Sequence, residues 1–401
     1  MTKTVNELKS QLEYIKYSKE EEHKYSEGVS QLFDLATSYI FDAEKAYRNG
    51  KNAVWTAAIW EAPFIYASDF IPVSYTELGR LVSSDVVRIA ENQFQLPAET
   101  CSMVKAALGE WHLRKGGINR ILGTSGGCEP FNIALEILKG EGYDVHYIDT
   151  TYRSPRCSQG EYEELVKYLM NQIKTAVRWL MGSELDEQRL GAELRLRNQA
   201  MRKIRRIMEL RLNAPLYIRS LPTMFMLMGS GHYFGKPEDY IDMLDTLLAE
   251  LEKESRKTNT DRYVPLVWSG GRGQEFGVYK SIDDANGSIL GWVIPTPYIR
   301  DYNEQLPPLE SLARYFLDGQ TAGSVGYQIK AVNEQVKKVN ARGIIFYGYI
   351  GCSFSGIQRE LLRDHFKKNG IPGITLEGSF QVGPPSGQLL TRVRAFTEML
   401  A

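Results

Sequence analysis

Residues 342–365, RGIIFYGYIGCSFSGIQRELLRDH, carry the strongest fold signal in this chain of 401 residues. The segment opens with residues 343–347, a short apolar run rich in β-branched and aromatic side chains, which predicts a buried strand. It ends with residues 357–365, whose apolar side chains at 357, 361 and 362 keep helical spacing. The turn between them places Cys352 at the carboxyl end of the strand, where open α/β sheets bind their ligands.

The same order of elements occurs in the first half of the chain. Residues 119–124 predict a short strand that runs through a glycine turn to Cys128, and residues 132–138 predict the helix that follows. Residues 143–151 then predict the next parallel strand. This strand–helix–strand order is typical of an α/β fold.

We therefore expect an α/β protein with two Rossmann-like parallel-sheet lobes. The expected divisions are a helical lead-in over residues 1–50, a first α/β lobe over 51–160, a helical section over 161–260 and a second α/β lobe over 261–401. A site between the lobes would lie at the carboxyl ends of strands from both sheets.

Charge and hydropathy exclude several classes of partner. The net charge of −1 and the pI of about 6.6 give no electrostatic reason to expect nucleic acid. Since no apolar run approaches the roughly 20 residues that span a bilayer, we expect no membrane span. The charged amino terminus is typical of a helix rather than a signal peptide, which predicts a cytoplasmic protein.

The four cysteines are too few for a disulfide framework, so their positions decide their interpretation. Cys101 begins a predicted helix over residues 101–108, where the positive end of the helix dipole favours a thiolate. Cys157 lies in a basic loop and is interpreted as a loop thiol. No CxxC pair or partner histidine motif indicates zinc, thioredoxin or acyl-transfer chemistry. Three thiolates from distant turns would suit a 4Fe–4S cluster with one open iron, and buried structural cysteines are the alternative.

Glu61 is a second kind of candidate, because it lies between Trp60 and Pro63 in an otherwise apolar stretch. Carboxylates are rarely buried without a partner. Glu61 is therefore either an acid at the start of a helix, for which Pro63 argues, or a site residue.

Three segments resemble the 2-hydroxyacyl-CoA dehydratase and benzoyl-CoA reductase family: TCSMVKAALG around Cys101, GTSGGCEPF around Cys128 and GIIFYGYIGCSFSG around Cys352. The tail KNGIPGITLEGS followed by GQLLTRVRAFTEML is similar to the closing pattern of the family and is the most specific part of the resemblance. The resemblance implies a 4Fe–4S cluster in the cleft between the lobes, held by these three cysteines.

The resemblance also implies the activity of a 2-hydroxyglutaryl-CoA dehydratase D-component-like subunit. Such a subunit pairs with a related second subunit in a heterodimer or higher oligomer, and an ATP-dependent iron–sulfur activator protein supplies a low-potential electron. In (R)-2-hydroxyacyl-CoA dehydratases this electron produces a ketyl radical on the acyl-CoA substrate and permits loss of water. Reduction of an aromatic ring is the runner-up activity, and an electron-relay or structural subunit is a further alternative.

The resemblance assigns the catalytic side chains less directly than the cysteines. Where the family carries a hydroxyl residue this chain has Ala57 and Ala58, and Glu77 is the candidate for the catalytic carboxylate beside Glu61. Four cysteines are also fewer than the double-cubane relatives require. These departures leave open whether the chain binds the substrate or relays electrons.

Overall fold

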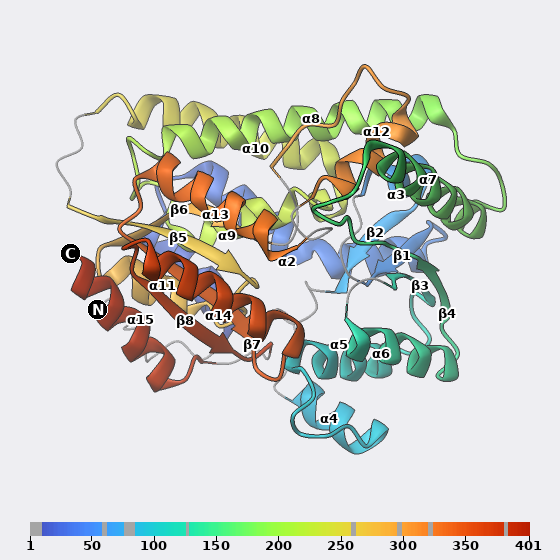
Figure 1. Cartoon of the computed structure of the whole chain (residues 1–401), viewed down its shortest axis with the longest axis horizontal. Coiled ribbons are helices and arrows are strands. Elements are labelled where there is room, and N and C mark those ends of the chain that lie inside the picture. Colours follow the sequence, from blue (N-terminus) through green and yellow to red (C-terminus); the bar gives the residue numbers. More distant parts are fainter. Residues whose placement is uncertain are drawn as a thin grey trace.

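The computed structural model describes residues 10–57, 62–75, 85–125, 128–257, 262–294, 299–319, 324–380 and 384–401. Its strands form two four-stranded sheets with parallel pairings, one in each lobe (Figure 1). The first sheet has the order β2-β1-β3-β4, with β1 (Ala53–Thr56), β2 (Ile71–Ser74), β3 (Arg120–Thr124) and β4 (Asp144–Ile148). The second has the order β6-β5-β7-β8, with β5 (Val264–Gly270), β6 (Gly287–Val293), β7 (Gly343–Tyr349) and β8 (Gly373–Gly378). The prediction of an α/β fold with two Rossmann-like lobes is confirmed.

Helices cover both faces of the second sheet. Ile344 and Phe346 of β7 pack in one apolar cluster with residues of α13 (Val325–Val339) and α14 (Ser353–Lys368). Ile345 and Tyr347 alternate with them and pack in another cluster with residues of α11 (Gly277–Asp284) and α15 (Gly387–Leu400). Because both faces are buried, this strand has a continuous apolar sequence rather than an alternating one.

Helices also pack around the first sheet. These are α3 (Pro63–Ala67), α4 (Asp85–Phe94), α5 (Ser102–Leu113), α6 (Glu129–Gly140) and α7 (Gln159–Met181). Trp55 of β1 lies edge-on to Trp111 of α5, with ring centroids 6.4 Å apart, and its indole N–H donates to the Ile118 carbonyl at 3.1 Å. The helix that carries Trp111 is thereby fixed against the sheet, and so is its amino terminus.

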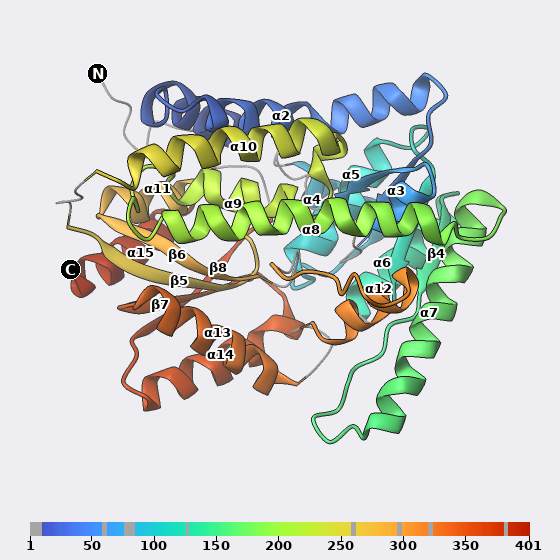
Figure 2. The ribbon, with the colours of Figure 1, turned by 90° about the horizontal axis from the view of Figure 1, so that it is seen from above.

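Three long helices lie side by side across both lobes: α2 (Glu27–Arg48), α8 (Glu187–Leu210) and α10 (Pro237–Glu254) (Figure 2). Near the start of α8, Arg189 forms an ion pair with Asp69, which follows α3 in the first lobe. Just after its end, the buried Arg211 donates to the Ile289 carbonyl of β6 in the second lobe at 3.1 Å. The helix α8 and the residue that follows it therefore contact both lobes.

The remaining elements pack around this framework. They are α1 (Gln11–Tyr17), the π-helix η2 (Ser18–Glu22), α9 (Ser220–Gly229), the 3-10 helix η4 (Tyr233–Gly235) and α12 (Pro308–Leu317). Across the described residues, no helix combines the length and apolar character that crossing a membrane requires.

Candidate functional site

Cys101, Cys128 and Cys352 share one structural position, since each is the N-cap residue of a helix. Cys128 follows β3 and precedes α6, and Cys352 follows β7 and precedes α14. Both therefore lie at strand-to-helix turns. Cys101 precedes α5, one residue before the helix start rather than inside its first turn as the sequence predicted, and it follows α4 rather than a strand.

The two lobes meet beside these cysteines. The Ser102 N–H donates to the Ile350 carbonyl at 2.9 Å, and the Phe380 N–H donates to the Ser102 hydroxyl at 3.2 Å. Gly351 has a φ of +77°, and a Cβ at this position would lie 2.5 Å from the Glu99 carbonyl oxygen. Only glycine combines this backbone conformation with so close an approach. The turn that carries one cysteine is thus placed directly against the segment that carries another.

The thiols themselves interact. Cys101 and Cys352 are hydrogen-bonded to each other, and Cys128 is close enough to Cys352 for their charges to interact. The hydrogen bond from Cys101, followed by Ser355 and the positive charge of Arg359, lowers the pKa of Cys352 to about 5. The same hydrogen bond and burial raise the pKa of Cys101, and burial raises that of Cys128. These opposite shifts favour one proton shared by the two thiols, with the negative charge at Cys352.

Backbone N–H groups of the first helical turn lie near each sulfur and favour its negatively charged form. The donors are Met103 and Val104 for Cys101, Phe131 for Cys128 and Ser355 for Cys352. These are the groups that an N-cap side chain normally satisfies, and they favour a negatively charged sulfur. Thiolates, rather than thiols, are the form in which cysteine binds iron.

Two buried phenols border the thiols. The Tyr75 ring lies 5.0 Å from the Phe131 ring and its hydroxyl contacts the Met103 sulfur at 3.2 Å. The Tyr349 hydroxyl donates to the Arg272 carbonyl at 2.8 Å. Burial raises the pKa of both phenols above the ordinary value. Both rings are therefore neutral, and they border a buried Cys101 and half-buried Cys128 and Cys352.

The arrangement fits an iron–sulfur cluster better than a single metal ion. In the part of the chain that the structure describes, no three or more His, Cys, Asp or Glu side chains are grouped so that they could hold one metal ion. A cluster sets a different requirement, because each thiolate binds a different iron. Three N-cap sulfurs from both lobes would supply such ligands, and iron binding would replace the hydrogen bond between Cys101 and Cys352.

The two carboxylate candidates lie in segments whose structure is not described. Glu61 and Glu77 both fall outside the described residues. Pro63 does occupy the first helical position of α3, which agrees with the start of a helix expected there. The catalytic assignment of both glutamates therefore stays a prediction.

Sequence reasoning missed three side chains around the thiols: Tyr75, Tyr349 and Arg359. Arg359 was detectable in principle, since it lies seven residues, or two helical turns, after Cys352 on the same face of α14. The two tyrosines come from different lobes, and no local pattern indicates their meeting.

Cys157 and His232 have different surroundings. Cys157 lies in a loop just before α7, where its Sγ is 3.5 Å from the Ser158 carbonyl oxygen. The imidazole of His232 is buried and stacked on Tyr39 with ring centroids 4.6 Å apart, and its Nδ1 accepts from the Phe234 N–H at 3.1 Å. The geometry of His232 is that of a structural residue.

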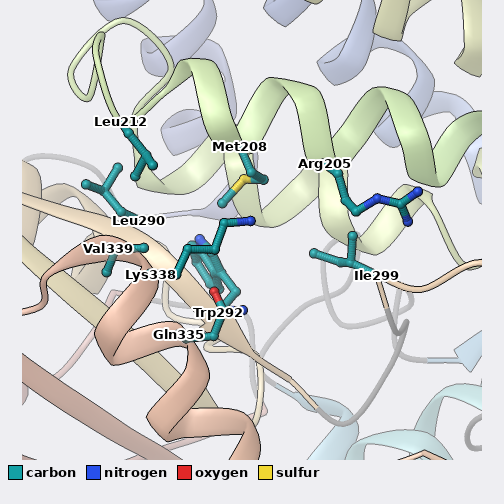
Figure 3. A pocket seen from close by; sticks show the side chains of 9 residues that line it. All are labelled: Arg205, Met208, Leu212, Leu290, Trp292, Ile299, Gln335, Lys338 and Val339. Carbon is teal, nitrogen blue, oxygen red and sulfur yellow. The ribbon is translucent and has the colours of Figure 1, made fainter.

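A separate pocket of about 90 Å³ lies between α8, β6 and α13 (Figure 3). Its lining is mainly apolar and includes none of the three N-cap cysteines: Arg205, Met208, Leu212, Leu290, Trp292, Ile299, Gln335, Lys338 and Val339. The charge of Arg205 is already paired with Asp301, at 2.7 Å. This pocket therefore offers no group of polar side chains comparable to the thiol site.

Comparison with known proteins gives two matches. The profile described as "2-hydroxyglutaryl-CoA dehydratase, D-component" matches residues 62–400. One of the subunits of the benzoyl-CoA reductase of Thauera aromatica is 23% identical over 229 residues, which are 55% of this chain. The matched region covers 58% of that relative's length. The profile match includes all three N-cap cysteines.

Proposed function

Because the chain belongs to the 2-hydroxyglutaryl-CoA dehydratase D-component family, we propose that it is the iron–sulfur subunit of an ATP-activated, one-electron acyl-CoA enzyme. The most suitable activity is that of an (R)-2-hydroxyacyl-CoA dehydratase, a lyase that removes water from a CoA thioester. One observation carries this proposal: three cysteines that are distant in sequence cap three helices at the junction of the lobes.

In this proposal Cys101, Cys128 and Cys352 hold a 4Fe–4S cluster. When bound, the cluster would supply a one-electron carrier and, at an iron without a cysteine ligand, a Lewis acid for a substrate oxygen. The protein contributes the three sulfurs and the N–H groups of the helix termini that stabilise their charge. Tyr75 and Tyr349 are buried beside the thiols and would limit the access of water to a bound substrate.

Glu77 and Glu61 are our candidates for proton transfer. Tyr75, two residues before Glu77 in the chain, borders Cys101 and Cys128, which supports a role for this segment near the substrate. We expect Glu77→Gln to lower turnover at least about tenfold without loss of iron, because a general acid–base group contributes on the order of 10²–10⁴ in rate. Unchanged turnover with full iron content would remove Glu77 from the site.

The proposed partners are a related second subunit and an ATP-dependent iron–sulfur activator protein. An apolar stripe on the surface supports a protein partner near the thiols. Ile350, Phe354, Ile357 and Leu361 are all exposed, from 45% for Phe354 to 72% for Ile357. These residues lie just before and along one face of α14, next to Cys352, and exposed apolar patches of this kind mark interfaces between proteins.

Two further functions are kept as alternatives. The similarity to part of a benzoyl-CoA reductase favours reduction of an aromatic ring as the second candidate. A subunit that only relays electrons, without its own substrate site, is the third. Adding acyl-CoA distinguishes the third from the first two, because only a cluster that contacts the substrate should change its electron paramagnetic resonance (EPR) spectrum.

The test of the proposed function begins with purification in the absence of oxygen, followed by iron analysis and EPR spectroscopy. We expect about four irons per chain, which is the content of one 4Fe–4S cluster. Cys352→Ser should abolish or convert the cluster, whereas Cys157→Ser is the matched control and should leave the absorbance spectrum unchanged. A colourless wild-type protein without iron would refute the proposal.

A further inference from the structure

A buried cation lies beside the thiol site. Arg359, on α14, is only 4% exposed. Fully buried arginines are rare, because removing a charge from water is costly unless partners compensate it. Its position two turns after Cys352 places it on the same face of the helix.

Hydrogen bonds and shape hold the Arg359 guanidinium in place. Its Nη1 donates to the Leu376 carbonyl of β8 at 2.9 Å, and its Nη2 donates to the Glu377 carboxylate. A Cβ at Gly348 of β7 would lie 2.3 Å from Nη1, so glycine at this position provides the space that the guanidinium fills. Backbone and side chains of both strands are therefore arranged around the cation.

The partners compensate the charge incompletely. The Glu377 side chain is 54% exposed, so solvent screens its interaction with Arg359. The Leu376 carbonyl is neutral, and the buried Nε has no hydrogen-bond partner among the described residues. The remaining positive charge lies on the same face of α14 as Cys352, so it acts on a group held by that sulfur.

We propose that Arg359 is a positioning residue whose buried charge raises the reduction potential of the group held by Cys352. This inference rests on the proposed function, since it requires an iron–sulfur cluster at the three cysteines. In the reduction step one electron leaves the reduced electron-transfer partner, which is thereby oxidised, and arrives at the site. Arg359 stays protonated throughout and takes up no proton.

The physical reason is the change in charge. An added electron makes the site more negative by one unit, and a fixed cation in a water-poor environment stabilises that state more than the oxidised one. Net charge, hydrogen bonding and solvent exposure are the factors by which proteins set the potentials of such clusters. The site must accept an electron from a partner, and a nearby cation makes this acceptance more favourable.

The test is a redox titration of the anaerobically purified variants, followed by EPR. Arg359→Gln should shift the reduction equilibrium at least tenfold toward the oxidised form, a fall of about 59 mV for one electron. Arg359→Lys keeps the charge and should shift it less. Arg363→Gln is the matched control, because Arg363 lies one turn further along α14, is 38% exposed and is paired with Glu360 and Asp364.

Glu377→Gln provides a test in the opposite direction. This variant removes the negative charge beside Arg359 while Arg359 remains, so the reduction potential should rise. A merely structural role of Arg359 would not lower the potential in Arg359→Gln and raise it in Glu377→Gln. If Arg359→Gln fails to fold, the reduction potential of Glu377→Gln tests the inference by itself. An unchanged potential in Arg359→Gln or Glu377→Gln, with full iron content, would overturn this inference and leave the proposed function intact. Absence of iron from the wild-type protein would instead overturn the proposed function.

Discussion

Gly351 offers the sharpest test of how the lobes are joined at the thiols. We predict that Gly351→Ala destabilises the protein and loosens the contact between the Cys352 turn and the Cys101 segment. Two costs combine at this position. The φ of +77° is unfavourable for alanine by roughly 1–2 kcal/mol, and the new Cβ would meet the Glu99 carbonyl oxygen at 2.5 Å. The obstacle is backbone, which cannot rotate away, so overpacking adds roughly 1–3 kcal/mol.

Gly370 provides a matched control for this variant. Its φ is +76°, nearly the same as that of Gly351, but a Cβ there would meet nothing within 4 Å. Gly370→Ala should therefore carry only the backbone cost of roughly 1–2 kcal/mol, against roughly 2–5 kcal/mol for Gly351→Ala. Urea unfolding followed by circular dichroism measures the difference, using the first transition because two lobes need not unfold together.

The iron content of the two variants supplies a second measurement. Gly351→Ala should lose iron, because it displaces one ligand relative to another, while Gly370→Ala should retain it. Equal destabilisation of the two variants, or full iron in Gly351→Ala, would refute the reasoning that this contact positions the cysteines.

Three further predictions concern other parts of the molecule. Ile357→Glu should leave folding unchanged but weaken binding of the proposed second subunit or activator, measured by pull-down and gel filtration. Leu113→Glu is the control, because Leu113 is also exposed but lies on α5. Equal binding by the two variants would show that the exposed apolar residues of α14 are not the binding surface. Burial raises the pKa of Glu275 from 4.5 to about 7, so the folded state binds this proton more tightly and its stability should fall as the pH rises from 4.5 through 7. Between pH 5 and pH 8 the free energy of unfolding, measured with urea, should fall by up to roughly 3 kcal/mol less in Glu275→Gln than in the wild type. An unchanged dependence of stability on pH would contradict the raised pKa of Glu275. Mild oxidation of the iron-free protein should join Cys101 to Cys352 in a disulfide, detected by peptide mapping without reductant, whereas a disulfide that includes Cys157 would contradict the observed contact.

The elements that were predictable from sequence are those with local signals. The β7–α14 and β3–α6 turns were recognised because an apolar run, a glycine turn and a helical pattern follow each other within about 20 residues. Cys101 was harder to place, since the segment before it is not a strand and its approach to Cys352 depends on contacts between the lobes. Such long-range contacts leave no periodicity in the sequence.

Which face of α14 is buried could not be predicted from the sequence either. Apolar residues at helical spacing normally mark the buried side of a helix, yet Ile357 and Leu361 are exposed, while Leu362, Phe366 and Arg359 are buried. The spacing identified the helix correctly but not its orientation. The exception is informative. An exposed apolar face costs stability unless a partner protein covers it. A buried arginine costs stability unless a charged group compensates it.

The use of N-cap cysteines links these observations to the proposed chemistry. A serine or aspartate at these positions would satisfy the same N–H groups, so capping alone does not explain the choice of cysteine at all three. The three positions also bring the positive ends of the helix dipoles of α5, α6 and α14 together near the sulfurs. Together with the buried charge of Arg359, these helix termini favour negative charge beside Tyr75 and Tyr349. Under the proposed function the site gains negative charge, which this combination stabilises, whereas a site built only for stability would be expected to contain apolar side chains instead.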